Sequence, residues 1–178
     1  MDVPFHALVS ELRARQVRFV LIGVAGANYF VTKGTPLYST RDRDLFLPPD
    51  PENLLLAWTG CESLRLELSA NGEPLDRPRD LWLAERVVAN RALTRATDGE
   101  DLLVDLTFVM AGFEFESVWR DRHEFTVEGQ VLPVARLGDI VRSKFNAGRP
   151  KDRLFLETHR ADLRDLLPGE STGDRDRT

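Results

Sequence analysis

The chain has 178 residues, of which 42% are hydrophobic and 30% charged, and its formal net charge at pH 7 is −5. This length and composition predict one globular domain with its own core, and the acidic balance argues against a protein that coats nucleic acid. The single cysteine, Cys61, excludes an internal disulfide and a cysteine-rich zinc site. With no signal-peptide pattern and no apolar run near the ~20 residues of a membrane span, we expect a soluble, cytoplasmic protein without membrane contact.

The N-terminal part begins with a helical pattern and continues with a strand pattern. Residues 3–15 carry apolar side chains at helical spacing, which predicts an amphipathic helix. Residues 18–22 form an apolar run typical of a buried strand. The small residues 23–28 then predict a glycine turn that leads into a short helix through Phe30. Such a turn is either a device for close packing or a phosphate site built from backbone N–H groups.

Residues 38–47 are the stretch that most directs our interpretation of the chain. Their apolar end, which Pro48 closes, predicts a strand, so Thr40, Asp42 and Asp44 share one face. Two carboxylates at this spacing lie roughly 6–7 Å apart, a suitable cradle for Mg²⁺. The alternative is that both aspartates pair with arginines on a solvated face.

The middle of the chain is less regular. We expect a helix over residues 51–58 and a strand over 64–68 that turns at 71–72. Residues 76–97 fit a helix or a strand equally well. They form the visibly basic region of the chain, which is either a solvated face or a site for an anionic substrate: Arg77, Arg79, Arg86, Arg91 and Arg95.

Asp105 stands alone inside an apolar run, residues 102–109, that predicts a buried strand. A carboxylate in such a place is costly unless it has a partner charge, a set of hydrogen bonds or a metal. The sequence leaves these three possibilities open.

The C-terminal part completes a single predicted domain, residues 1–167. The patterns indicate a helix over residues 114–122 and a hairpin over 124–134 that turns at 128–129. Two final helices are expected over 136–146 and 151–167. The composition of residues 168–178 is typical of a disordered tail. Arg149 and Asp152 are interpreted as structural, joining the last two helices.

The order of these features resembles the nucleotidyltransferase superfamily, and in particular its small bacterial members of the kind paired with toxin–antitoxin modules. In that family a strand ends in Gly-Gly or Gly-Ser, a helix follows, the next strand carries Asp-x-Asp, and a later strand carries a third acid. The matching positions are Gly23, then Asp42 and Asp44, then Asp105. The segment 137–152 is also similar to those small members.

The resemblance implies an α/β fold with a mixed sheet flanked by helices, the C-terminal helices lying beside the cleft. It also implies a transfer of a nucleoside monophosphate from an NTP to a hydroxyl of a protein, an RNA end or a small molecule. Asp42, Asp44 and Asp105 would be catalytic and would bind Mg²⁺ or Mn²⁺. The residues implied in nucleotide binding are Gly23, Val24, Gly26, Thr40, Lys144 and Lys151.

Two other readings stay open. Val24 stands where the family has its second glycine or a serine, which favours an inactive nucleotidyltransferase-like protein acting as a binding or regulatory partner, for instance in a toxin–antitoxin pair. The third reading is an α/β domain without any nucleotide, in which Asp105 is buried against an arginine.

Overall fold

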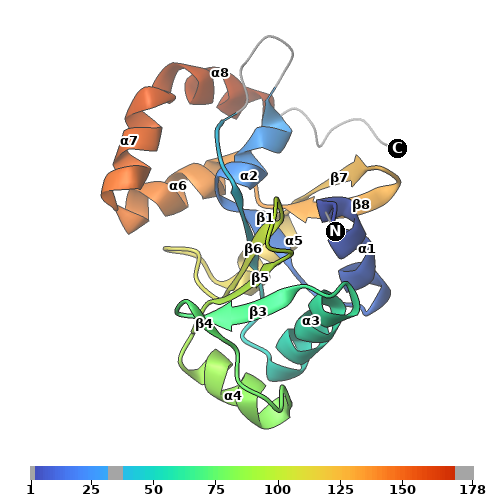
Figure 1. The fold of residues 1–178 in the computed structure, drawn as a ribbon. Helices are drawn as coiled ribbons and strands as arrows, with labels where there is room; N and C mark the ends of the chain where they lie inside the picture. Colours follow the sequence, from blue (N-terminus) through green and yellow to red (C-terminus); the bar gives the residue numbers. More distant parts are fainter. Residues whose placement is uncertain (1–2, 32–37, 171–178) are drawn as a thin grey trace.

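The computed structural model describes residues 3–31 and 38–170, in which strands and helices are interspersed and the last three elements are helices (Figure 1). The strands are β1 (Val20–Ile22), β2 (Asp42–Phe46), β3 (Glu67–Ala70), β4 (Glu73–Pro74), β5 (Thr94–Thr97), β6 (Leu103–Thr107), β7 (His123–Val127) and β8 (Gln130–Val134). The helices are α1 (Phe5–Ala14), α2 (Gly23–Ala27), the 3₁₀ helix η1 (Asn28–Phe30), α3 (Pro51–Ser63), α4 (Leu81–Ala89), α5 (Phe115–Asp121), α6 (Leu137–Ala147), α7 (Pro150–Thr158) and α8 (Arg160–Glu170).

All of these strands belong to one mixed sheet, in the order β4-β3-β5-β6-β2-β1-β8-β7. The pairs β2–β6 and β1–β8 are parallel, and the others are antiparallel. The predicted α/β class with a mixed sheet flanked by helices is confirmed, and β2 lies between β1 and β6 in this sheet.

The two faces of the sheet bury two separate clusters, because side chains alternate along each strand. Leu21, Leu45 and Leu106 point into the larger cluster, which α1, α3 and α4 cover. Ile22 and Phe46 point the other way, into a smaller cluster with residues of α5, α6 and α8. Figure 1 shows α6, α7 and α8 grouped together, away from α1 and α3. Asp42 and Asp44 share the face of Phe46 and therefore lie on the side of these C-terminal helices.

Two expectations for the first half of the chain were wrong. The expected glycine turn does not precede the helix, since α2 begins at Gly23 directly after β1. Small residues make this possible: a Cβ at Gly26 would lie 3.1 Å from both Ile140 Cδ1 and the Leu21 carbonyl oxygen. The strand expected over 64–68 begins instead at Glu67, because α3 continues to Ser63 and Arg65 then adopts a φ of 60°. The turn at residues 71–72 is confirmed between β3 and β4.

The ambiguous segment 76–97 contains both kinds of structure, α4 and then β5. The hairpin β7–β8 and its turn at residues 128–129 are confirmed.

The last expected helix is divided. α7 ends at Thr158 and α8 begins at Arg160, with His159 packed against the rings of Tyr38 and Phe155 at centroid distances of 4.5 and 4.9 Å. The break lets Leu163 of α8 reach the smaller core cluster. α8 also passes Pro168, where the disordered tail was expected to begin, and residues 171–178 lie outside the described residues.

Within the described residues, no helix is long and apolar enough to cross a membrane.

Candidate active site

The predicted acidic residues lie in one cavity, of about 710 Å³, between the middle of the sheet and the helices α6 and α7. One wall comes from the end of β1, from β2 and from the neighbouring strands β6 and β5, and the opposite wall from α6 and α7. The polar residues of this lining that matter below are Thr40, Asp42, Asp44, Arg95, Asp105, Lys144, Arg149, Lys151 and Asp152.

Strand register brings the acids together. Asp44 pairs with Ile22 on one side and with Asp105 on the other, and Asp105 pairs in turn with Arg95. Because residues in register on adjacent strands point to the same face, Asp44, Asp105 and Arg95 form one row across β2, β6 and β5. Sixty residues of sequence separate Asp44 from Asp105, so only the fold makes them neighbours.

Gly23 is the residue against which Asp44 packs. Its φ is 69°, a left-handed value that side chains rarely adopt, and a Cβ at this position would overlap Asp44 Oδ2. The missing side chain of Gly23 therefore leaves room for the Asp44 carboxylate at the start of α2.

The electrostatics of Asp44 are those of a crowded carboxylate. Burial raises its pKa above the ordinary value, and the negative charges of Asp105 and Asp42 raise it further, while Lys144 and Lys151 oppose the shift. Within residues 3–31 and 38–170, the side chains of Asp42 and Asp44 have neither a hydrogen bond nor an ion pair. Thr40 lies beside them and donates from Oγ1 to the Asp42 carbonyl oxygen at 3.1 Å.

Asp105 differs from the other two acids because it has a counter-charge. Arg95 donates from Nε to Asp105 Oδ1 at 2.7 Å and from a terminal nitrogen to Oδ2 at 2.9 Å. The Asp105 side chain is 7% exposed and that of Arg95 is 40% exposed. Of the three possibilities that the sequence left open for Asp105, a partner charge is the one observed.

This pairing decides how well the residues fit a metal ion. Among the described residues, no group of three or more histidine, cysteine or acidic side chains is arranged to hold one. The Asp42 and Asp44 carboxylates are open to the cavity and fit a hard cation that takes its remaining ligands from water and phosphate. Asp105 differs because Arg95 holds both of its oxygens, and its predicted role as a third metal ligand stays a prediction.

The opposite wall is organised by Asp152, a carboxylate with only 1% exposure. It accepts hydrogen bonds from Lys144 Nζ at 3.2 Å and from Arg149 Nε at 2.6 Å. Burial alone would raise the pKa of Asp152, but these two hydrogen bonds outweigh it and hold the pKa below its usual value. The structural interpretation is confirmed for Asp152, whose bond to Lys144 joins α6 to α7, while Arg149 bonds Asp152 at the start of α7.

Most of the predicted nucleotide-binding residues line the cavity: Gly23, Val24, Thr40, Lys144 and Lys151. Gly26 does not, since it is buried between Ile140 and Leu21. Arg95 is the functional candidate that the sequence analysis did not single out. It was one of five arginines in an ambiguous segment, and no local pattern marks the one that β5 places opposite Asp105.

Comparison with known proteins adds a fold relationship. No family model and no curated protein sequence matches this chain. The solution structure of the antibiotic-resistance factor ANT(2'')-Ia is similar, with a TM-score of 0.50 and 15% sequence identity over 93% of this chain and 88% of that chain. At this identity the similarity concerns the fold. The chain has a nucleotidyltransferase-like fold.

Proposed function

We propose that this protein transfers a nucleoside monophosphate from an NTP to a hydroxyl group, with Mg²⁺ or Mn²⁺ held at Asp42 and Asp44. The observation that carries the proposal is the charge distribution of the cavity. Two carboxylates that make no ion pair within the described residues face a wall that contains Lys144 and Lys151. Acids on one side and lysines on the other suit a cation-bound triphosphate. The fold neighbour is a nucleotidyltransferase, which supports nucleotidyl transfer in general.

The proposed roles follow from position. Asp42 and Asp44 hold the cation, which when bound neutralises the charge that develops on the phosphate. Lys151 is exposed and reaches phosphate oxygens as a mobile point charge, whereas Lys144 is held in place by Asp152. Gly23 and Val24 present the backbone at the start of α2 to the same cavity. Once Arg95 no longer holds its carboxylate, Asp105 would accept the proton of the attacking hydroxyl.

The test is a labelling experiment. The protein is incubated with each α-labelled NTP and Mg²⁺, together with cell protein, RNA or a panel of small hydroxyl compounds. This panel includes an aminoglycoside because the fold neighbour is an aminoglycoside nucleotidyltransferase. We expect label to enter one acceptor class with wild type and with the surface variant Asp121→Asn, and not with Asp42→Asn or Asp44→Asn. Equal labelling by all four proteins contradicts the proposal.

A second candidate function is favoured by the Arg95–Asp105 pair. A protein whose third acid is permanently paired would bind a nucleotide without transferring it and would act as a binding or regulatory partner. Saturable NTP binding with no transfer to any acceptor class would support this alternative. A toxin–antitoxin partner and a cytoplasmic location remain predictions from the sequence.

A further inference from the structure

Arg95 is placed to control the third acid of the candidate site. β5 and β6 set it directly opposite Asp105, and its guanidinium group engages both carboxylate oxygens, the strongest geometry for such a pair. The Asp105 side chain is almost fully buried, so the bond replaces the water that the carboxylate has lost. The Asp105 carboxylate therefore needs Arg95 as its counter-charge while no other ligand is bound to it.

The same arginine is accessible from the cavity. Its side chain is 40% exposed and lines the cavity that also contains Asp42 and Asp44. The negative charges of Asp42 and Asp44 also stabilise its positive charge. An anionic ligand in this cavity would offer Arg95 an alternative partner at short range.

We propose that Arg95 masks Asp105 in the nucleotide-free protein, so that a divalent cation meets two carboxylates and binds weakly until an anionic ligand draws Arg95 away. Arg95 is then a positioning residue that couples cation binding to nucleotide binding. This inference rests on the proposed function for the identity of the anionic ligand, but masking itself concerns the protein and the cation alone.

The test measures binding of Mn²⁺ without nucleotide, by calorimetry and electron paramagnetic resonance. Masking predicts that Asp105→Asn leaves the Mn²⁺ affinity within about twofold of wild type, because Asp105 is not available as a ligand. It predicts that Arg95→Leu, which frees a third carboxylate, raises the affinity about tenfold or more. The double variant Arg95→Leu/Asp105→Asn should lose this gain.

A purely structural ion pair would give a different pattern. No rise in Arg95→Leu, a rise that persists in the double variant, or a large loss in Asp105→Asn would overturn the proposal. Should Arg95→Leu fail to fold, Asp105→Asn remains decisive, and Arg95→Lys, which cannot make two parallel hydrogen bonds, should show a smaller rise. Because no nucleotide is present, failure of the transfer reaction would not alter these results.

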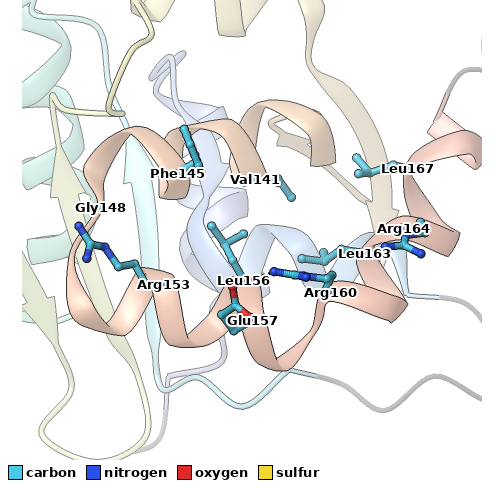
Figure 2. A pocket seen from close by; sticks show the side chains of 10 residues that line it. All are labelled: Val141, Phe145, Gly148, Arg153, Leu156, Glu157, Arg160, Leu163, Arg164 and Leu167. Atoms are coloured by element: carbon cyan, nitrogen blue, oxygen red, sulfur yellow. Dashed lines mark hydrogen bonds and ion pairs between the residues drawn. The ribbon is translucent and has the colours of Figure 1, made fainter.

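A separate observation concerns a groove formed by α6, α7 and α8, which shares no lining residue with the cavity of these acids. Its volume is about 1090 Å³. Figure 2 shows the side chains of Val141, Phe145, Leu156 and Leu167 along this groove. Phe145 is 77% exposed and adjoins the half-buried Val141, Leu156 and Leu167, and a contiguous apolar patch of this kind can mark an interaction site.

The charge along the groove is opposite to that of the whole chain. Arg153, Arg160 and Arg164 line it with a single acid, Glu157, whereas the formal net charge of the protein is −5. Arg160 bonds Glu157 at 2.8 Å. Arg153 and Arg164 make no ion pair within the described residues. The groove is thus an apolar floor with unneutralised positive charge at its edges.

These features identify the occupant. Residues 171–178 carry no apolar side chain and so do not match the apolar floor of the groove. A second copy bound face to face would bring the same arginines together, since a two-fold contact pairs a patch with itself. We infer that the groove binds an amphipathic helix of a partner protein, with leucine-like residues on one face and acids on the other.

The test uses two synthetic helical peptides with the same leucine stripe, one with glutamates and one with lysines at the remaining positions. The acidic peptide should bind at least about tenfold more tightly. Phe145→Ala should weaken that binding about tenfold or more, whereas Leu154→Ala should change it less than about twofold. Leu154 is a matched control because it lies on α7, is 68% exposed and does not line the groove.

Three results would overturn this inference. They are equal affinity for the two peptides, equal effects of the two alanine substitutions, and a dimeric mass in light scattering that Phe145→Ala converts to a monomer. Charge reversal by Arg153→Glu and Arg164→Glu should weaken the acidic peptide and strengthen the basic one. Loss of folding would weaken the binding of both peptides, so it could not produce these opposite changes in affinity.

Discussion

Gly23 leaves the space that the Asp44 carboxylate occupies, because any Cβ at position 23 would overlap Asp44 Oδ2. The glycine follows β1 directly and begins α2, while the aspartate lies on β2, so the contact joins the predicted glycine position to the predicted acid. We therefore expect both nucleotide binding and the position of Asp44 to depend on the residue at position 23.

Gly23→Ala should destabilise the fold by about 1–3 kcal/mol, through its positive φ and the displaced carboxylate, and should abolish cation-dependent nucleotide binding. The control is Gly99→Ala, which has a φ of 82° and open space around the missing Cβ. It should lose about 1 kcal/mol and keep full binding. Thermal melts and calorimetric titration measure the two effects, and retention of binding in Gly23→Ala would count against the contact.

Asp44→Asn should melt at a higher temperature than wild type near pH 7.5, because burial and the charges of Asp105 and Asp42 raise the pKa of Asp44. A change on the order of 1 kcal/mol corresponds to about 2–4 °C for a chain of this size. A raised pKa means that the folded state binds the proton more tightly, so wild type gains stability as the pH falls through that pKa. The advantage of the variant should shrink towards pH 4. A lower melting temperature at pH 7.5 would instead indicate a structural carboxylate.

Nucleotide stabilisation should require the cation. ATP or another NTP should raise the melting temperature when Mg²⁺ or Mn²⁺ is present, because a nucleotide at 100 times its Kd adds about 2.7 kcal/mol to the free energy of unfolding. Without the cation, the triphosphate and the carboxylates of Asp42 and Asp44 repel each other. Equal stabilisation in excess EDTA would contradict a carboxylate-bridged site.

Asp152→Ala should destabilise the protein by about 3 kcal/mol, because Lys144 and Arg149 lose a buried partner at the junction of α6 and α7. The pKa of Asp152 is depressed in the folded state, so its contribution is present above the unfolded value of about 3.9 and is lost as the pH falls below it. Denaturant melts at pH 7 and pH 3 measure both effects. The exposed pair Arg120–Asp121 supplies the control, since Asp121→Ala should cost less than about 0.5 kcal/mol.

Much of the fold could be predicted because the patterns involved are local. The apolar run before Gly23, the acidic strand and the hairpin of β7 and β8 all form strands, and each ends within one residue of its expected C-terminal bound. The misplaced boundaries depend on distant contacts. α3 continues past residue 58, and its Gly60 packs against Leu12 of α1, while α8 separates from α7 where His159 packs against Tyr38.

The sequence by itself determined which strands carry Asp42, Asp44 and Asp105 and which side of each strand they face, because alternation along a strand is a property of the local chain. Only the tertiary structure decided their electrostatic states. The register of β5 against β6 places Arg95, rather than another arginine of the basic segment, opposite Asp105. Register depends on the packing of the whole sheet, so charge partners 10 residues apart along the chain cannot be assigned from spacing.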